Sequence, residues 1–161
     1  MEWLDECRGH CRRIKYLSEK LQWGEKQNHS GSLIAQSTVL DDSRVAIPGL
    51  YFKGVYTSRP LTGDVYSFAL MAATNKGVRY RVFMLEVYPD HHISHRERGL
   101  VLYGPHVHLG DERLAQITKG VFQRTAVPSV RRWIERFRRH SRILDDENNR
   151  LSHPLSGTLF E

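Results

Sequence analysis

Histidines crowd one short part of this sequence. The stretch PDHHISHRERGLVLYGPHVHLGD, residues 89–111, holds five of the nine histidines, at positions 91, 92, 95, 106 and 108. Because an imidazole has an ordinary pKa of about 6.5, one histidine of a pair can act as a base at neutral pH while the other acts as an acid. The spacing of His106 and His108 places both side chains on one face of a strand. The stretch therefore indicates acid–base chemistry or metal binding.

Two arginines precede the histidines on a segment with the pattern of a strand. The segment VRYRVFMLEVY, residues 78–88, alternates so that Arg79 and Arg81 share a face. If residue 87 pairs with residue 100 in one long hairpin, Arg81 lies opposite His106, and polar side chains meet polar ones. Arg79 then lies opposite His108. We therefore predict a catalytic site of Arg79, Arg81, His106 and His108, with His91 and His92 in the adjoining loop.

These residue types suit the cleavage of RNA without a metal ion or another cofactor. One histidine takes the proton of the ribose 2′ hydroxyl, an arginine stabilises the charge on the phosphorane, and a second acid protonates the departing 5′ oxygen. Two alternatives stay open. The histidines lie in a polar loop and do not converge, or they bind a metal ion and the protein is a metal-dependent hydrolase. Further ligands would then come from His91, His92, His95, Glu86, Asp90 and Asp111.

A run of residues between 79 and 110 resembles the signature of TumE-like small toxins of toxin-antitoxin modules. In that family an arginine and an acidic residue on one strand precede a proline-histidine turn and an H-x-H strand. The resemblance covers about a fifth of the chain and has a glutamate where an aspartate is expected. It implies a growth-inhibiting RNase toxin that a cognate antitoxin neutralises. The matching residues are Arg81, Glu86, His91, His92, His106 and His108.

Positive charge is concentrated in a second segment. The formal net charge of the chain is +6, and residues 124–142 hold seven arginines and one glutamate. The segment predicts a helix capped by Ser129, with Val130, Trp133, Ile134 and Phe137 toward the core. Exposed arginines suit RNA phosphates or an acidic protein partner such as an antitoxin, but they are also typical of a solvated face. We predict a nucleic-acid-binding face of Arg131, Arg132, Arg138 and Arg139, which would also serve a non-enzymatic inhibitor module.

Periodicity predicts an α+β fold. Apolar spacing indicates an opening helix over 3–23, and strand patterns follow at 32–40, 50–57, 65–74, 78–88 and 100–109. Asn75-Lys76-Gly77 is typical of a tight hairpin turn. Helices are expected over 111–122 and 128–144, followed by a loosely ordered tail over 145–161. We therefore expect one domain, 1–161, with an antiparallel β-meander of about four to five strands, an N-terminal helix and C-terminal helices.

Composition narrows the class of protein. Hydrophobic residues make up 40% of the chain, which is ordinary for a globular domain, and no apolar run reaches the length that spans a bilayer. With no signal-peptide core and only Cys7 and Cys11, we expect a cytoplasmic protein without a disulfide framework or a membrane partner. The sequence as a whole predicts a metal-independent endoribonuclease of toxin-antitoxin type, with RNA and an antitoxin as partners.

Overall fold

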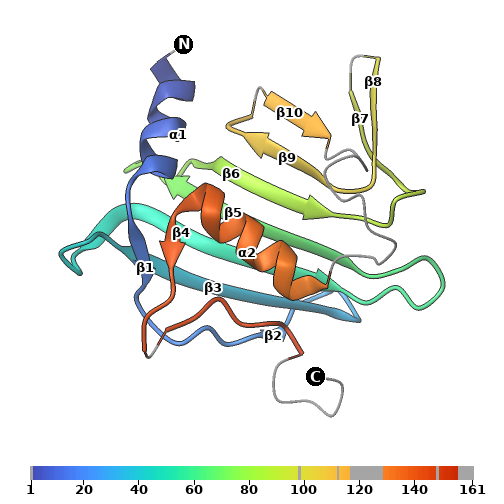
Figure 1. Cartoon of the computed structure of the whole chain (residues 1–161), viewed down its shortest axis with the longest axis horizontal. Coiled ribbons are helices and arrows are strands. Elements are labelled where there is room, and N and C mark those ends of the chain that lie inside the picture. The colour runs from blue at the N-terminus through green and yellow to red at the C-terminus, as the bar shows by residue number, and fades with distance from the viewer. Residues whose placement is uncertain (1, 98, 112, 117–128, 148, 156–161) are drawn as a thin grey trace.

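A large curled sheet dominates the molecule. In a computed structural model, which describes residues 2–97, 99–111, 113–116, 129–147 and 149–155, nine strands form one mixed sheet and two more form a separate hairpin (Figure 1). The large sheet runs in the order β10-β9-β6-β5-β4-β3-β1-β11, and β2 pairs with β3. Its strands are β1 (Lys15–Leu17), β2 (Gly24–Glu25), β3 (Ser32–Leu40), β4 (Ala46–Thr57), β5 (Val65–Ala73), β6 (Arg79–Val87), β9 (His106–Leu109), β10 (Arg113–Gln116) and β11 (Ile143–Leu144). The hairpin consists of β7 (Ile93–Glu97) and β8 (Leu100–Tyr103), and the two described helices are α1 (Glu2–Arg12) and α2 (Val130–Ser141).

The predicted α+β class and the meander of four to five strands are wrong, because the described chain is mostly β. The helix expected over 3–23 ends at Arg12, and β1 follows it. The helix expected over 111–122 is also wrong where it can be compared, since 113–116 form β10 and pair with β9. Residues 117–122 lie outside the described residues. Short strands such as β1 and β10 gain their hydrogen bonds from distant partners, so local periodicity does not reveal them.

Buried Lys15 satisfies carbonyl groups where the first helix ends. Its side chain is fully buried, and its ammonium group donates hydrogen bonds to the backbone carbonyls of His10 and Arg13 at the end of α1. Carbonyl groups in the last turn of a helix lack partners within the helix, and a lysine ammonium satisfies them. The chain then continues as β1 because the amide of Lys15 donates to the carbonyl of Arg142 at 2.9 Å.

The central antiparallel strands confirm the alternating patterns of the sequence. Strands β3, β4, β5 and β6 pair in sequence order, and the 75–77 turn joins β5 to β6. Gly77 adopts a φ of +77°, a conformation that glycine reaches without steric cost. The hairpin turn expected at Asn75-Lys76-Gly77 is therefore confirmed.

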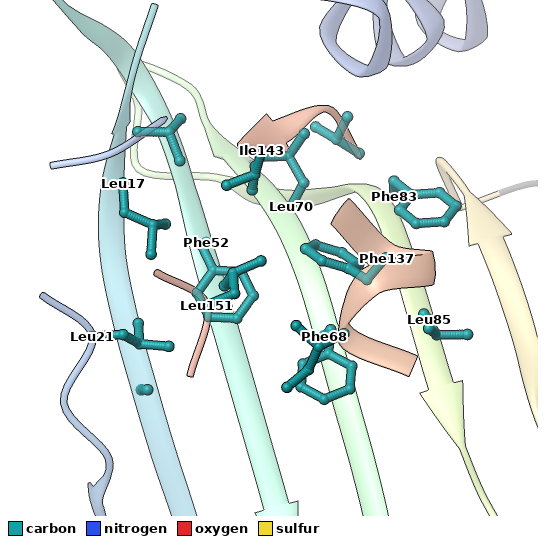
Figure 2. Packing of buried hydrophobic residues seen from close by; sticks show 14 of the residues in the cluster. Leu17, Leu21, Phe52, Phe68, Leu70, Phe83, Leu85, Phe137, Ile143 and Leu151 are labelled. Atoms are coloured by element: carbon teal, nitrogen blue, oxygen red, sulfur yellow. The ribbon is translucent and has the colours of Figure 1, made fainter. Parts of the chain in front are cut away.

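Helix α2 covers one face of the sheet and closes the core. The Phe137 ring lies 5.7 Å from that of Phe52, 6.0 Å from that of Phe68 and 5.8 Å from that of Phe83, which brings β4, β5 and β6 together under the helix (Figure 2). Trp133 and Ile134 are buried beside Phe137, as the helical stripe predicted. The helix therefore covers the apolar face of the sheet.

The segment after β11 is packed as far as residue 155. Leu151 is only 8% exposed and belongs to the same core, and the indole nitrogen of Trp23 donates to the carbonyl of Ser152 at 3.2 Å. The loosely ordered tail expected over 145–161 stays a prediction, and within its described part Leu151 belongs to the main core. Residues 156–161 lie outside the described residues.

Candidate functional site

His106 and His108 lie on β9, but their partners on β6 differ from the predicted ones. Glu86 pairs with His106 and Met84 pairs with His108, so the predicted register, with Arg81 opposite His106, is wrong. The prediction assumed one strand over 100–109. Instead the chain breaks at Gly104-Pro105: residues 100–103 pair with β7, and only 106–109 pair with β6.

Gly104 makes this break possible. Its φ is +65°, and a Cβ atom there would lie 3.1 Å from the Cα of Asp90. Pro105 follows and has no amide hydrogen to donate to a sheet. The two residues therefore end the hairpin and start β9 in a new direction, which sets the register of both histidines.

A β-bulge in β6 brings Arg81 to the same face as the histidines. Leu70 pairs with Phe83, but its neighbour Met71 pairs with Arg81, so Val82 is an extra residue. An extra residue inverts the alternation of side chains beyond it. Arg81 therefore shares a face with Met84 and Glu86, and its guanidinium forms an ion pair of 3.2 Å with Asp111.

Three histidines converge on this face. One ring nitrogen from each of His95, His106 and His108 lies within 4.8 Å of the others. His95 comes from the β7–β8 hairpin, which stands beside β9 in Figure 1, and its ring centre lies 6.1 Å from that of His106 and 5.7 Å from that of His108. His106 and His108 are 0% and 2% exposed. Two sheets thus build one imidazole cluster, in which His95 is half-buried and the other two rings are buried.

Glu86 joins the cluster through a single carboxylate oxygen. Its Oε2 lies 3.0 Å from Nε2 of His106 and 3.1 Å from Nε2 of His108. The contact with His108 is a hydrogen bond, whereas the contact with the buried Nε2 of His106 is short but is not aligned as a hydrogen bond. The other nitrogen of His106, Nδ1, faces the carbonyl of Gly104 at 3.4 Å. When Nδ1 carries the hydrogen toward this carbonyl, Nε2 presents a free lone pair to the cluster.

The electrostatics of the cluster favour a charged carboxylate on Glu86. Burial raises the pKa of Glu86, but its contacts with His106 and His108 and their charge outweigh burial and hold that pKa at about 2. Burial lowers the pKa of His108, the hydrogen bond with Glu86 opposes this change, and the positive charge of Arg81 adds to the lowering. A carboxylate together with imidazoles is the donor set of a transition-metal site.

The distances from Glu86 to His106 and His108 suit a common ion. Ligand atoms that each lie about 2.1 Å from one ion are about 3.0 Å apart at a bond angle of about 90° and about 3.4 Å apart at a tetrahedral angle. The contacts of Glu86 with His106 and His108, at 3.0 and 3.1 Å, fall in this range. The side chain of Glu86 is 22% exposed, so water or a substrate can approach from that side.

The other predicted catalytic residues lie outside the cluster. Arg79 is exposed opposite Ala73, and it lines a separate cavity near Gly49. His91 is exposed at the end of β6 and lines a cavity there. His92 stacks on Tyr88, with ring centres 5.2 Å apart. Of the predicted catalytic residues, the structure therefore brings together His106, His108 and, at the margin, Arg81.

Glu86 and His95 complete the site, although the predicted catalytic set omitted them. Glu86 was named only for the family resemblance and as a possible metal ligand, and His95 only as a possible ligand. The face shared by His106 and His108 was visible in the H-x-H spacing, but the pairing with Glu86 depends on where the hairpin breaks. The Gly-Pro pair before His106 was the signal for that break.

The arginine helix lies on the other side of the sheet. Phe137 of α2 contacts Phe83, whose side chain points away from the face that holds Glu86 and His108. Arg131, Arg132 and Arg139 are exposed, as predicted. Arg138 is instead half-buried, because it forms an ion pair of 3.2 Å with Asp145 and donates to the carbonyl of Ile143.

Comparison with known proteins finds no relative of this chain. No family model, curated protein or solved structure matches the chain. Within the described residues, neither helix has the length and apolar character needed to cross a bilayer. The toxin resemblance and the cytoplasmic location stay predictions.

Proposed function

We propose that the protein is a metal-dependent hydrolase whose centre is formed by His95, His106, His108 and Glu86. The observation that carries this proposal is the convergence of one ring nitrogen from each of three histidines within 4.8 Å, with Oε2 of Glu86 lying 3.0 Å from Nε2 of His106. Coordination of an ion would satisfy the buried Nε2 of His106, which forms no aligned hydrogen bond. The cluster is therefore explained as a ligand set.

The ligand types select the class of metal. Imidazole nitrogens suit zinc, iron, nickel and copper, and a carboxylate oxygen extends the range to manganese. The carbonyl of Gly104 faces Nδ1 of His106 at 3.4 Å and orients the ring. A bound divalent ion would activate water at the exposed side of Glu86 and polarise the bond to be cleaved.

Positive charge beside the centre favours an anionic substrate. Arg81 lies on the same face, and its charge acts on His108. A guanidinium stabilises charge that develops on oxygen during the hydrolysis of a phosphate ester. We therefore infer phosphate-ester hydrolysis as the reaction class.

Metal-free RNA cleavage, the activity expected of a toxin of this type, is the second candidate. The hydrogen bond between Glu86 and His108 favours it, because a carboxylate that orients an imidazole is a common part of acid–base catalysis. Burial of His106 and His108 argues against it, because a phosphodiester has to contact both groups. The two candidates differ in their response to a chelator.

Calorimetric titration with zinc or manganese tests the first candidate. The wild type should bind one equivalent, and His106→Ala or His95→Ala should weaken binding at least about 100-fold, since loss of second-shell groups alone costs about 10–100-fold. His29→Ala is the matched control, because it removes an exposed imidazole from a distant loop.

Activity separates the two candidates. Hydrolysis of bis(p-nitrophenyl) phosphate should stop when a chelator is added and return when the metal is restored. If RNA cleavage persists in the presence of a chelator and is lost in His108→Ala, the protein is a metal-free RNase and the first candidate is wrong. A wild-type protein that binds neither metal contradicts the first candidate.

A further inference from the structure

A cavity opens beside the proposed metal centre, at the end of β6. It has a volume of about 780 Å³, which lies within the range of about 300–1,000 Å³ that is usual for small-molecule sites. The turn before β5, the residues after β6, Pro105 and the start of α2 form its walls. The cavity therefore lies where the β7–β8 hairpin joins the large sheet.

Tyr88 forms a wall that the cavity shares with the metal centre. The residue lines the cavity, and its ring lies 6.2 Å from that of His106 and nearly parallel to it, at 26°. The Tyr88 ring also stacks on the ring of His92, at an interplanar angle of 6°. Tyr88 follows the last residue of β6, and none of the four proposed metal ligands lines the cavity. The ring of Tyr88 therefore stands between a ligand in the cavity and His106.

Aromatic side chains from three elements surround the space. Tyr66 comes from β5, Tyr88 from the end of β6 and Trp133 from α2. Planar rings are favoured by such walls, since stacking of a base on one aromatic side chain contributes about 1–3 kcal/mol. The aromatic walls therefore select a flat ligand.

Two carboxylates give the cavity a preference for ligands with hydrogen-bond donors. Asp64 and Asp90 both line the cavity. Asp64 is held in place, because its oxygens accept hydrogen bonds from the hydroxyl of Tyr56 at 3.1 Å and from the amide of Arg59 at 3.0 Å. Negative charge favours a ring that carries N–H donors over a ring that carries only acceptors.

We propose that this cavity binds a planar aromatic ring with N–H donors, such as a nucleobase, as one part of the substrate. The inference has a second part, that the phosphate ester linked to this ring reaches the proposed metal centre. This second part rests on the proposed function. Arg81 then lies on the far side of the centre from the cavity. The arrangement defines the substrate class as a nucleotide phosphate ester.

Binding of adenosine to the metal-free protein tests the cavity by itself. Calorimetry in the presence of a chelator should show adenosine binding, and Tyr88→Leu should weaken it by about 5- to 150-fold, the equivalent of one stacking contact. Tyr51→Leu is the matched control, because it shortens a half-buried tyrosine of β4 that does not line this cavity. N-acetylphenylalanine amide serves as a second probe with an aromatic ring but without a nucleobase.

The outcomes separate this inference from the proposed function. Equal adenosine affinity in the wild type and in folded Tyr88→Leu overturns the inference even if zinc binds. No detectable binding at about 10 mM adenosine overturns it as well. Tighter binding of the phenylalanine probe overturns the nucleobase assignment. If adenosine binds and no metal does, only the proposed function fails.

A measurement on the unmodified protein covers the case in which Tyr88→Leu does not fold. In an NMR titration with adenosine, the shifted amide signals should belong to residues that line the cavity, namely 61–64, 88, 90, 91, 129, 130 and 133. Shifts spread over the sheet without these segments would contradict the site.

Discussion

The guanidinium of Arg81 lies 3.6 Å from the sulfur of Met84, on the same side of β6. Residues three positions apart on a regular strand point to opposite faces, so this contact exists only because the bulge at Val82 restores a common face. The bulge thus places a positive charge beside His108 that a regular strand would direct into the core.

Removal of this charge should impair catalysis more than folding. We expect Arg81→Gln to lower kcat/KM for bis(p-nitrophenyl) phosphate by about 100-fold, which is typical for the loss of one group that stabilises developing charge. Arg79→Gln is the control, because Arg79 lies on the same face two positions away and is exposed. Equal losses in both variants would show that only the net charge of the strand matters.

Lys15 should contribute to stability through its buried ammonium group. Lys15→Met leaves two backbone carbonyls without their partner, so we expect the free energy of unfolding to fall by about 1–3 kcal/mol at pH 7. Lys20→Met, at an exposed position, should change it by less than about 0.5 kcal/mol. Urea denaturation of the three proteins measures the difference.

The same lysine should make stability depend on pH. Burial lowers the pKa of Lys15 from 10.5 to about 8. Between these two values the unfolded chain binds more protons than the folded one, so stability rises with pH. The stability difference between the wild type and Lys15→Met should therefore grow from about pH 8 to pH 10.5. A difference that is constant over this range would mean that Lys15 titrates as an exposed lysine.

Leu151 should anchor the segment that follows β11. Because the side chain is 8% exposed and belongs to the main core, we expect Leu151→Ala to lower the free energy of unfolding by about 2–5 kcal/mol. Leu144→Ala, at a side chain that is 36% exposed, should cost clearly less. Similar melting temperatures for Leu151→Ala and the wild type would contradict the packing of this segment.

The exposed arginines of α2 should separate RNA binding from stability. If the helix binds RNA phosphates, replacing Arg131, Arg132 and Arg139 with glutamine should weaken binding to different RNA sequences by similar factors and make its salt dependence shallower. The unfolding free energy should stay within about 0.5 kcal/mol. Arg138→Gln should instead leave RNA binding nearly unchanged and lower the free energy of unfolding by about 1 kcal/mol. The reason is that its side chain pairs with Asp145 and donates to the carbonyl of Ile143.

Local patterns were sufficient for part of the fold and of the site. Alternation along 65–74 and 78–88 predicted β5 and β6, because each strand has one buried face. The stripe with Trp133 and Phe137 predicted α2 and its buried side. The H-x-H spacing predicted the common face of His106 and His108, since that depends only on the alternation of one strand.

Relationships between distant segments were beyond those patterns. The pairing of His106 with Glu86 depends on the break at Gly104, and the approach of His95 depends on how a second hairpin lies against the sheet. The pairing of β1 with β11 joins two segments that carry almost no strand signal of their own. Such contacts form because tertiary packing compensates for weak local preference.

The parallel pairing of Lys15 with Ile143 ties an early segment of the chain to a late one. During synthesis on the ribosome, strands β3 to β6 emerge long before α2 and β11. Until then Phe52, Phe68 and Phe83 have no helix above them. Incomplete chains that expose apolar surface and unpaired strand edges aggregate readily. A nascent chain that stops before residue 130 is therefore expected to be a substrate for chaperones or proteases, and the core is completed only after translation has passed Leu151.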